Sequence, residues 1–178
     1  MNDVNSNPYF KLFLKQRENQ YAVGNRSYKE RRKILTQLQR AIEVTYRTQI
    51  QEALQKDLGK PVVETELTEI FAIIGDIKHA KKHLKQWTQK QRVETPMSML
   101  GSSSYITYEP KGVCLIISPW NFPFNLTFGP LVSAIAAGNT AIIKPSEMTP
   151  HSSALMSKII ADVFLEDEVA LVQGEVEV

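Results

Sequence analysis

Two short apolar runs, about thirty residues apart, constrain the fold more than any other feature of the chain. The first, residues 113–117, is too short and too rich in β-branched residues to be a helix, and Ser118 and Pro119 close it. Such a run is typical of a fully buried strand in a parallel sheet. The second, residues 141–143, is followed by Lys144, and an apolar stretch at residues 126–137 lies between the two runs. This order predicts a β-α-β unit.

Polar residues follow both predicted strands, where a buried sheet would not choose them for packing. Asn121 follows the first strand, and Lys144 and Glu147 follow the second. In an open α/β sheet, ligands bind outside the carboxyl ends of the strands. The sequence therefore predicts that an amide, an ammonium group and a carboxylate lie together at the carboxyl end of the sheet.

Two motifs at this spacing resemble the NAD(P)-dependent aldehyde dehydrogenases: PWNFP at residues 119–123 and GNTAIIKPSE at residues 138–147. The sequence PFNLTFGPLVSAIAAGN at residues 123–139 is similar to the branch of that family that acts on fatty and aromatic aldehydes. The resemblance covers nearly the whole chain and is firmest over residues 110–174. It implies a Rossmann-like sheet, oxidation of aldehydes to carboxylic acids with NAD or NADP, and a homo-oligomer.

The resemblance assigns a catalytic role to Asn121. Aldehyde oxidation by a thiol passes through a tetrahedral intermediate with a negatively charged oxygen, and a preorganised amide aimed at that oxygen stabilises it by about 3 kcal/mol. The structural alternative is a turn residue, because asparagine is favoured in turns. We favour the oxyanion donor, on the condition that the carboxy-terminal part of such an enzyme is supplied.

The resemblance also implies a cofactor site. Glu147 would accept hydrogen bonds from the hydroxyl groups of the adenosine ribose, and Lys144 would donate to the same ribose. The structural alternatives are a surface lysine and an acid near a helix start, which the helix dipole favours. No G-x-G-x-x-G turn follows the first strand, so the pyrophosphate cannot bind there in the usual Rossmann manner. The expected cofactor-binding residues are Ile117, Ser118, Pro119, Trp120, Lys144, Ser146 and Glu147.

The family's nucleophilic cysteine and general-base glutamate have no counterpart in this sequence. The single cysteine, Cys114, lies inside the first apolar run, where a thiol behaves as a small hydrophobic group rather than as a reactive thiolate. We therefore expect the chain to be the amino-terminal part of a longer enzyme and to be inactive alone. The alternative is a stand-alone nucleotide-binding or interaction module that uses Lys144 and Glu147 without catalysis. The reading frame downstream of Val178 distinguishes the two.

Charge and hydropathy exclude several partners. The chain has 21 Lys and Arg against 19 Asp and Glu, a net charge of +2, which argues against nucleic acid. No apolar run reaches the length of a membrane span and no signal peptide is evident, and a single cysteine fits a reducing compartment, so we expect a cytoplasmic protein. His79 and His83 share a predicted helix but lack an H-E-x-x-H pattern and a third ligand, which predicts no metal site.

The sequence before residue 90 predicts helices. Residues 8–21 have apolar residues at helical spacing, and Ser27 with Glu30 forms a capping box that begins a long helix. A second long helix is expected from about Val63, and the short connection between the two long helices predicts antiparallel packing. The expected apolar stripes are Leu35, Leu38, Ile42, Tyr46, Ile50, Leu54 and Leu58 on the first long helix, and Leu67, Ile70, Ile74, Ile77, Leu84 and Trp87 on the second.

These elements predict an α/β fold: amino-terminal helices, a short β segment, then the first β-α-β-α-β half of a doubly wound, Rossmann-like sheet. The later elements are a strand at residues 105–108, a helix that begins at Thr149 and Pro150, and a strand at residues 169–172. Three parts are expected. They are residues 1–91, the helical part of the cofactor-binding domain; residues 92–110, a β segment that the resemblance links to oligomerisation; and residues 111–178, the first half of the NAD(P)-binding sheet.

Overall fold

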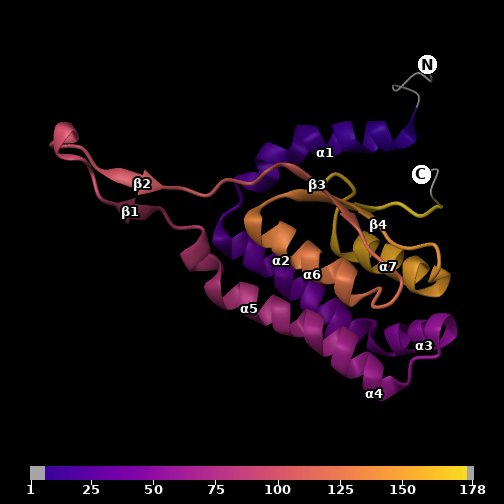
Figure 1. Cartoon of the computed structure of the whole chain (residues 1–178). Helices are drawn as coiled ribbons and strands as arrows, with labels where there is room; N and C mark the ends of the chain where they lie inside the picture. The colour runs from indigo at the N-terminus through magenta and orange to yellow at the C-terminus, as the bar shows by residue number, and fades with distance from the viewer. Residues whose placement is uncertain (1–6, 176–178) are drawn as a thin grey trace.

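The computed structural model describes residues 7–175, and it confirms the expected fold class (Figure 1). A three-stranded parallel sheet forms the centre, helices lie on both of its faces, and a two-stranded hairpin projects from one side. Residues 1–6 and 176–178, which belong to the first and third expected parts, lie outside the described residues. No described helix is both long enough and apolar enough to cross a membrane.

The parallel sheet forms where the apolar runs predict it. Strand β3 (Val113–Ile117) pairs with β4 (Thr140–Lys144), and β4 pairs with β5 (Val169–Leu171), so β4 is the central strand. Helix α6 (Asn125–Ala137) connects the first two strands and α7 (Pro150–Val163) connects the last two. Helix α6 ends at Gly138, whose φ of 87° is the left-handed conformation that glycine adopts without strain.

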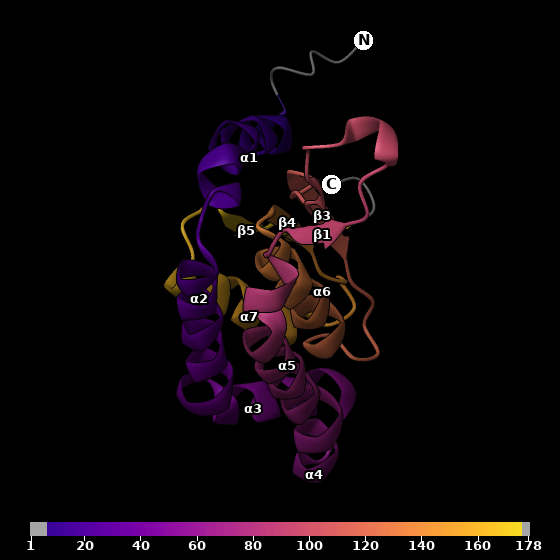
Figure 2. The ribbon, with the colours of Figure 1, turned by 90° about the vertical axis from the view of Figure 1, so that its left-hand side faces the viewer.

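Helices cover the two faces of the sheet unequally. Helix α1 (Pro8–Gly24) lies across one face, whereas α6 and α7 pack on the other (Figures 1 and 2). Helices α2 (Tyr28–Arg40) and α5 (Phe71–Trp87) then pack against α6 as an outer layer. The helical layer therefore contacts the sheet mainly through α6 and α7.

Each of the two expected long helices is interrupted by one π-helical turn. The first is α2, a π-helical turn at Ala41–Thr45, and α3 (Arg47–Leu58), and it begins at the expected capping box. The second is α4 (Val62–Thr65), a π-helical turn at Glu66–Ile70, and α5. An apolar repeat of three or four residues does not reveal these wider turns.

The expected apolar stripes are largely buried, with two exceptions. Leu67 is 61% exposed and Trp87 is 42% exposed. Leu67 lies in a π-helical turn, which changes the angular position of each residue, so that Leu67 points outward and Glu69, which is not on the expected stripe, is buried beside Ile70. Trp87 ends α5 and stacks on His83, with 5.8 Å between the ring centroids.

The expectation that residues 113–117 form a fully buried strand is wrong. Only Ile116 of β3 is buried, while Leu115 and Ile117 are 64% and 69% exposed and Cys114 is half-buried. The reason is that β3 is an edge strand, and α1 crosses more of β4 than of β3. The face of β3 that carries Leu115 and Ile117 is open to solvent.

The projecting hairpin consists of β1 (Gln91–Val93) and β2 (Ser104–Ile106), which pair antiparallel. The sequence predicts the second strand at residues 105–108, which starts one residue and ends two residues later than β2, and it does not predict the first. Its tip carries a short 3-10 turn, Met97–Met99, and strongly exposed apolar side chains. In Figure 1 the hairpin extends away from the rest of the chain, so its own packing does not bury these side chains.

Candidate functional site

Two turns leave the carboxyl end of the sheet side by side. The first turn (residues 118–124) follows β3, and the second turn (residues 145–149) follows β4. Ile117 and Lys144 are paired in the parallel register, and the N–H of Ser118 donates to the carbonyl of Lys144 over 3.1 Å. The sheet therefore fixes where both turns start and places them next to each other.

The first turn is buried at its ends and exposed in its middle. Ser118 is buried, and its hydroxyl group lies 2.6 Å from the hydroxyl of Thr127 in α6. At the other end, Phe124 is completely buried in the core. Between these anchors Trp120 and Asn121 are exposed, so the Asn121 amide is available at the carboxyl end of the sheet.

A lysine from the helical layer contacts the backbone of this turn. Lys60 follows Gly59, which ends α3 in the left-handed conformation with a φ of 65°. The Lys60 ammonium donates to the Glu69 carboxylate over 2.6 Å and to the backbone carbonyl of Asn121 over 2.8 Å. It also lies 4.1 Å from the centroid of the Phe122 ring, a favourable cation–π geometry.

The partner of this lysine, Glu69, is completely buried. Its second carboxylate oxygen accepts the backbone N–H of Asn125, over 2.8 Å, at the first residue of α6. Burial raises the pKa of the Glu69 carboxyl, while the hydrogen bonds from Lys60 and from the backbone N–H of Asn125 act in the opposite direction. The Asn125 side chain also donates to the carbonyl of Thr68, over 3.1 Å, so α6 starts against the π-helical turn.

The second turn is held by contacts within it, and the Asp57 carboxylate of α3 accepts the N–H groups of His151 and Ser152, over 3.1 and 2.7 Å, directly after it. The Lys144 ammonium lies 2.9 Å from the Glu147 carboxylate, and this hydrogen bond lowers the pKa of Glu147. The side chain of Glu147 is 38% exposed. Ser146 accepts the N–H of Met148 through its hydroxyl, over 3.2 Å, and its carbonyl accepts the Ser153 hydroxyl, over 3.0 Å. The expected cation and carboxylate are thus paired with each other at the surface.

The structure places the remaining candidates as follows. Cys114 is half-buried in β3, and burial raises the pKa of its thiol, which disfavours a thiolate. The rings of His79 and His83 lie next to each other, tilted by 39°, with 4.3 Å between centroids. Among residues 7–175 no group of three or more His, Cys, Asp and Glu side chains is arranged to hold a metal ion.

Sequence patterns did not predict a role for Lys60 or Glu69 at this site. One signal for Glu69 is present in the sequence: it lies four residues before Ile73 and eight before Ile77, which are both completely buried, so an acid falls on an apolar stripe. Buried acids are rare unless they are paired. No local pattern identifies the partner, because Lys60 reaches Asn121 across 61 residues of sequence.

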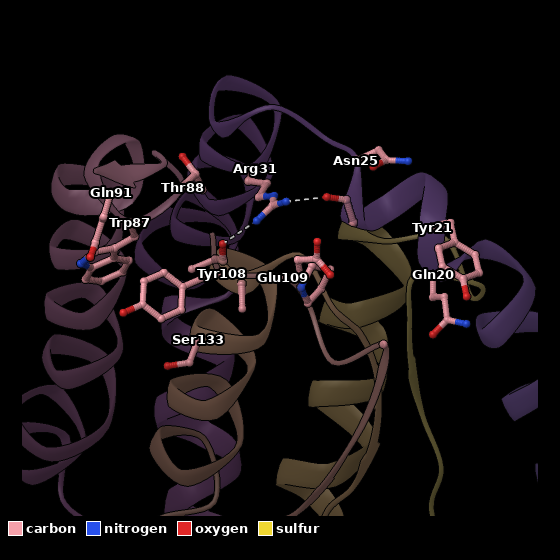
Figure 3. Close-up of a pocket in the computed structure, with 15 residues that line it drawn as sticks. Gln20, Tyr21, Asn25, Arg31, Trp87, Thr88, Gln91, Tyr108, Glu109 and Ser133 are labelled. Carbon is pink, nitrogen blue, oxygen red and sulfur yellow. Dashed lines mark hydrogen bonds between the residues drawn. The ribbon is translucent and has the colours of Figure 1, made fainter. Parts of the chain in front are cut away.

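A cavity of about 770 Å³ lies at the opposite, amino end of the sheet (Figure 3). Arg31 lies at its wall and donates to the carbonyls of Gly24 and Ala136, over 2.6 and 3.0 Å, which the dashed lines mark. These carbonyls belong to the last turns of α1 and α6, so Arg31 holds two helix ends together. Ligands of open α/β sheets bind at the carboxyl ends of the strands, which favours the two turns as the functional site.

Comparisons with known proteins agree on one family, the aldehyde dehydrogenases. The model of the aldehyde dehydrogenase family matches residues 11–178. The 4,4'-diaponeurosporen-aldehyde dehydrogenase of Staphylococcus aureus is 46% identical over 147 residues, which are 83% of this chain and 32% of that protein. The chain spans about a third of the length of such relatives and corresponds to the amino-terminal part of the family domain.

Solved structures agree with the fold. The substrate-bound structure of Staphylococcus aureus AldH superposes with a TM-score of 0.92 at 40% identity, over 96% of this chain and 37% of that one. The glyceraldehyde-3-phosphate dehydrogenase GapN of Methanocaldococcus jannaschii, complexed with NADP, superposes with a TM-score of 0.83 at 23% identity, over 94% of this chain and 36% of that one. The second likeness shows the fold alone.

Proposed function

The chain belongs to the aldehyde dehydrogenase family, and we propose on this basis that it is the cofactor-binding, amino-terminal part of an enzyme that oxidises aldehydes to carboxylic acids with NAD or NADP. The observation that carries the proposal is that two adjacent turns at the carboxyl end of one parallel sheet carry an exposed amide, Asn121, and a lysine–glutamate pair, Lys144 with Glu147. Parallel sheets of this type bind their ligands there.

The second turn fits the ribose of a dinucleotide. Glu147 offers a carboxylate whose pKa is lowered by Lys144, so it is ionised near neutral pH and accepts hydrogen bonds from two hydroxyl groups. Lys144 keeps donors for the same ribose, and Ile117, Ser118, Pro119, Trp120 and Ser146 border the site through the two turns. When bound, the cofactor supplies the acceptor for the hydride of the substrate. GapN, which shares this fold at 23% identity, was solved in complex with NADP.

The first turn fits an oxyanion donor. Asn121 lies in the exposed middle of a turn with buried ends, so its amide is accessible and its backbone is held. Thiolate attack on an aldehyde places negative charge on the former carbonyl oxygen, and the amide N–H groups donate to that oxygen. A preorganised donor of this kind stabilises the transition state more than the substrate.

The other chemical groups come, in this proposal, from sequence outside this chain. The one thiol is half-buried with a raised pKa, so it does not serve as the nucleophile. The chain alone is therefore inactive. The cofactor-binding domain comprises residues 1–91 and 111–178, and residues 92–110 associate subunits of a homo-oligomer through the exposed apolar hairpin. A single cysteine fits a reducing compartment, and we propose a cytoplasmic location.

The test is aldehyde oxidation by the product of the complete reading frame that contains this chain. We expect NAD(P)-linked oxidation, and Asn121→Ala should lower kcat by about 10²–10³-fold while the Kd for the cofactor stays unchanged. Asn25→Ala is the control, because Asn25 is an exposed asparagine at the opposite end of the sheet. A reading frame that stops at Val178, with a product that binds dinucleotide without oxidation, would favour the binding module instead.

A further inference from the structure

We propose that Lys60 and Glu69 are positioning residues for Asn121: their buried ion pair fixes the backbone of the turn that presents the amide. This inference rests on the proposed role of Asn121 as oxyanion donor. Neither residue touches the reacting atoms, and both act through the first turn.

The pair holds the first turn at Asn121 and at Asn125, the residue directly after the turn. The Lys60 ammonium binds the carbonyl of Asn121 itself, over 2.8 Å, and the Glu69 carboxylate binds the N–H of Asn125, over 2.8 Å. Because the 2.6 Å ion pair joins these two contacts, the segment from Asn121 to Asn125 cannot shift without disturbing the pair. The Phe122 ring, 4.1 Å from the ammonium, adds a third contact within the same segment.

The burial of the pair makes it rigid. The side chains of Lys60 and Glu69 are 8% and 0% exposed, so water cannot replace either partner. A buried charge that loses its partner is strongly disfavoured, which keeps both groups in contact. The ion pair of the second turn, at 19% and 38% exposure, has no such constraint.

Rigidity at this position bears on the reaction. An oxyanion donor works when it is already in place before charge develops, so that no reorganisation accompanies the reaction. Productive geometry has to be held within roughly 0.5 Å. The Asn121 carbonyl is attached to the same Cα as its side chain, so fixing that carbonyl fixes the origin of the amide.

The competing explanation is that the pair only stabilises the helical layer and the start of α6. A double-mutant cycle separates the two explanations, because residues that act through Asn121 lose their effect once the amide is removed. A general loss of stability would instead lower kcat by the same factor in the wild-type enzyme and in the Asn121→Ala variant.

The experiment uses the product of the complete reading frame, with the neutral pair Lys60→Met/Glu69→Gln. We expect kcat to fall by about 10- to 100-fold with an unchanged Kd for the cofactor. In the Asn121→Ala background the same pair should lower kcat by less than about twofold. The matched control is Arg47→Met/Glu66→Gln, which removes a 2.7 Å ion pair from the adjacent helical segments without touching the first turn.

Equal reductions in kcat in the two backgrounds would overturn the inference, as would full activity of the folded neutral pair. If the neutral pair does not fold, Lys60→Arg replaces it, because arginine keeps the charge for Glu69 while its planar guanidinium changes the contact with the Asn121 carbonyl. Lys60→Arg should lower kcat by less than the neutral pair does, and this reduction should disappear in the Asn121→Ala background. An equal reduction in the wild-type and Asn121→Ala backgrounds would again contradict the inference. If the wild-type product does not oxidise aldehydes, the proposed function is refuted. If it does, but the effects of the Lys60/Glu69 substitutions and of Asn121→Ala on kcat are additive, only the positioning role is refuted.

Discussion

The two turns at the carboxyl end of the sheet start from paired residues yet are held in different ways. The first is fixed by a buried ion pair from the helical layer, through the carbonyl of Asn121 and the N–H of Asn125. The second has hydrogen bonds within its own few residues and a partly exposed pair, Lys144 with Glu147. Directly after it, the Asp57 carboxylate of α3 accepts the N–H groups of His151 and Ser152 at the start of α7. The sheet thus sets the place of both turns. The helical layer reaches both, but it contacts the first through Asn121 itself with a buried ion pair, and it holds the second only through the first turn of the helix that follows.

This difference matches the two proposed roles. Stabilising a transient negative charge requires a donor that is fixed in advance. Recognition of a ribose makes a smaller demand, because the ligand stays bound and the side chains can adjust around it. The helices before residue 90 therefore do more than cover the sheet, since they bear directly on the turn that carries the proposed catalytic amide.

The largest expected effect tests the buried pair through the stability of the chain. Lys60→Met leaves Glu69 buried without its cation and should lower the free energy of unfolding by about 3–5 kcal/mol. Arg47→Met, which breaks a more exposed pair, should lower it by about 1 kcal/mol or less. Urea denaturation monitored by circular dichroism measures both. Similar losses in the free energy of unfolding for the two variants would show that the buried pair stabilises the chain no more than the exposed pair does.

A smaller effect tests the second turn through cofactor choice. The Glu147 carboxylate should repel the additional phosphate of NADP, and Lys144 partly offsets this, so the enzyme should prefer NAD without excluding NADP. In the complete product, Glu147→Gln should shift the ratio of Michaelis constants toward NADP by roughly fivefold. Glu166→Gln is the control, because this exposed carboxylate pairs with Lys15 elsewhere. An unchanged ratio in the Glu147 variant would remove its proposed role.

The smallest effect concerns pH. The Glu147 pKa is lowered in the folded chain by the hydrogen bond from Lys144, so its contribution to stability is present above its ordinary pKa of 4.5 and is lost as pH falls through the folded pKa. Wild type should therefore be slightly more stable than Glu147→Gln at pH 7, and the difference should disappear at acidic pH. Thermal unfolding at pH 7 and at pH 3 compares them. If the difference in stability between wild type and Glu147→Gln grew as the pH fell, the Lys144–Glu147 hydrogen bond would not be the source of the stabilisation.

Sequence patterns predicted the sheet better than they predicted the support for its turns. Residues 113–117 and the capping box at Ser27 are local signals, and the structure reproduces both. The exposure of Leu115 was not predictable, because the position of a strand at the edge of a sheet depends on the whole topology. The contact of Lys60 with Asn121 was missed for a related reason, since it joins segments that only tertiary packing brings together.

The contrast between the two turns is tested most directly by hydrogen exchange of two backbone amides in the wild-type chain. The N–H of Asn125 donates to buried Glu69, whereas the N–H of Met148 donates to Ser146 at the exposed second turn. NMR-detected exchange should show Asn125 protected at least about 100-fold more than Met148, with a rate set by large-scale opening. Equal protection of the two amides would contradict the account, because the first turn would then be no more firmly held than the second.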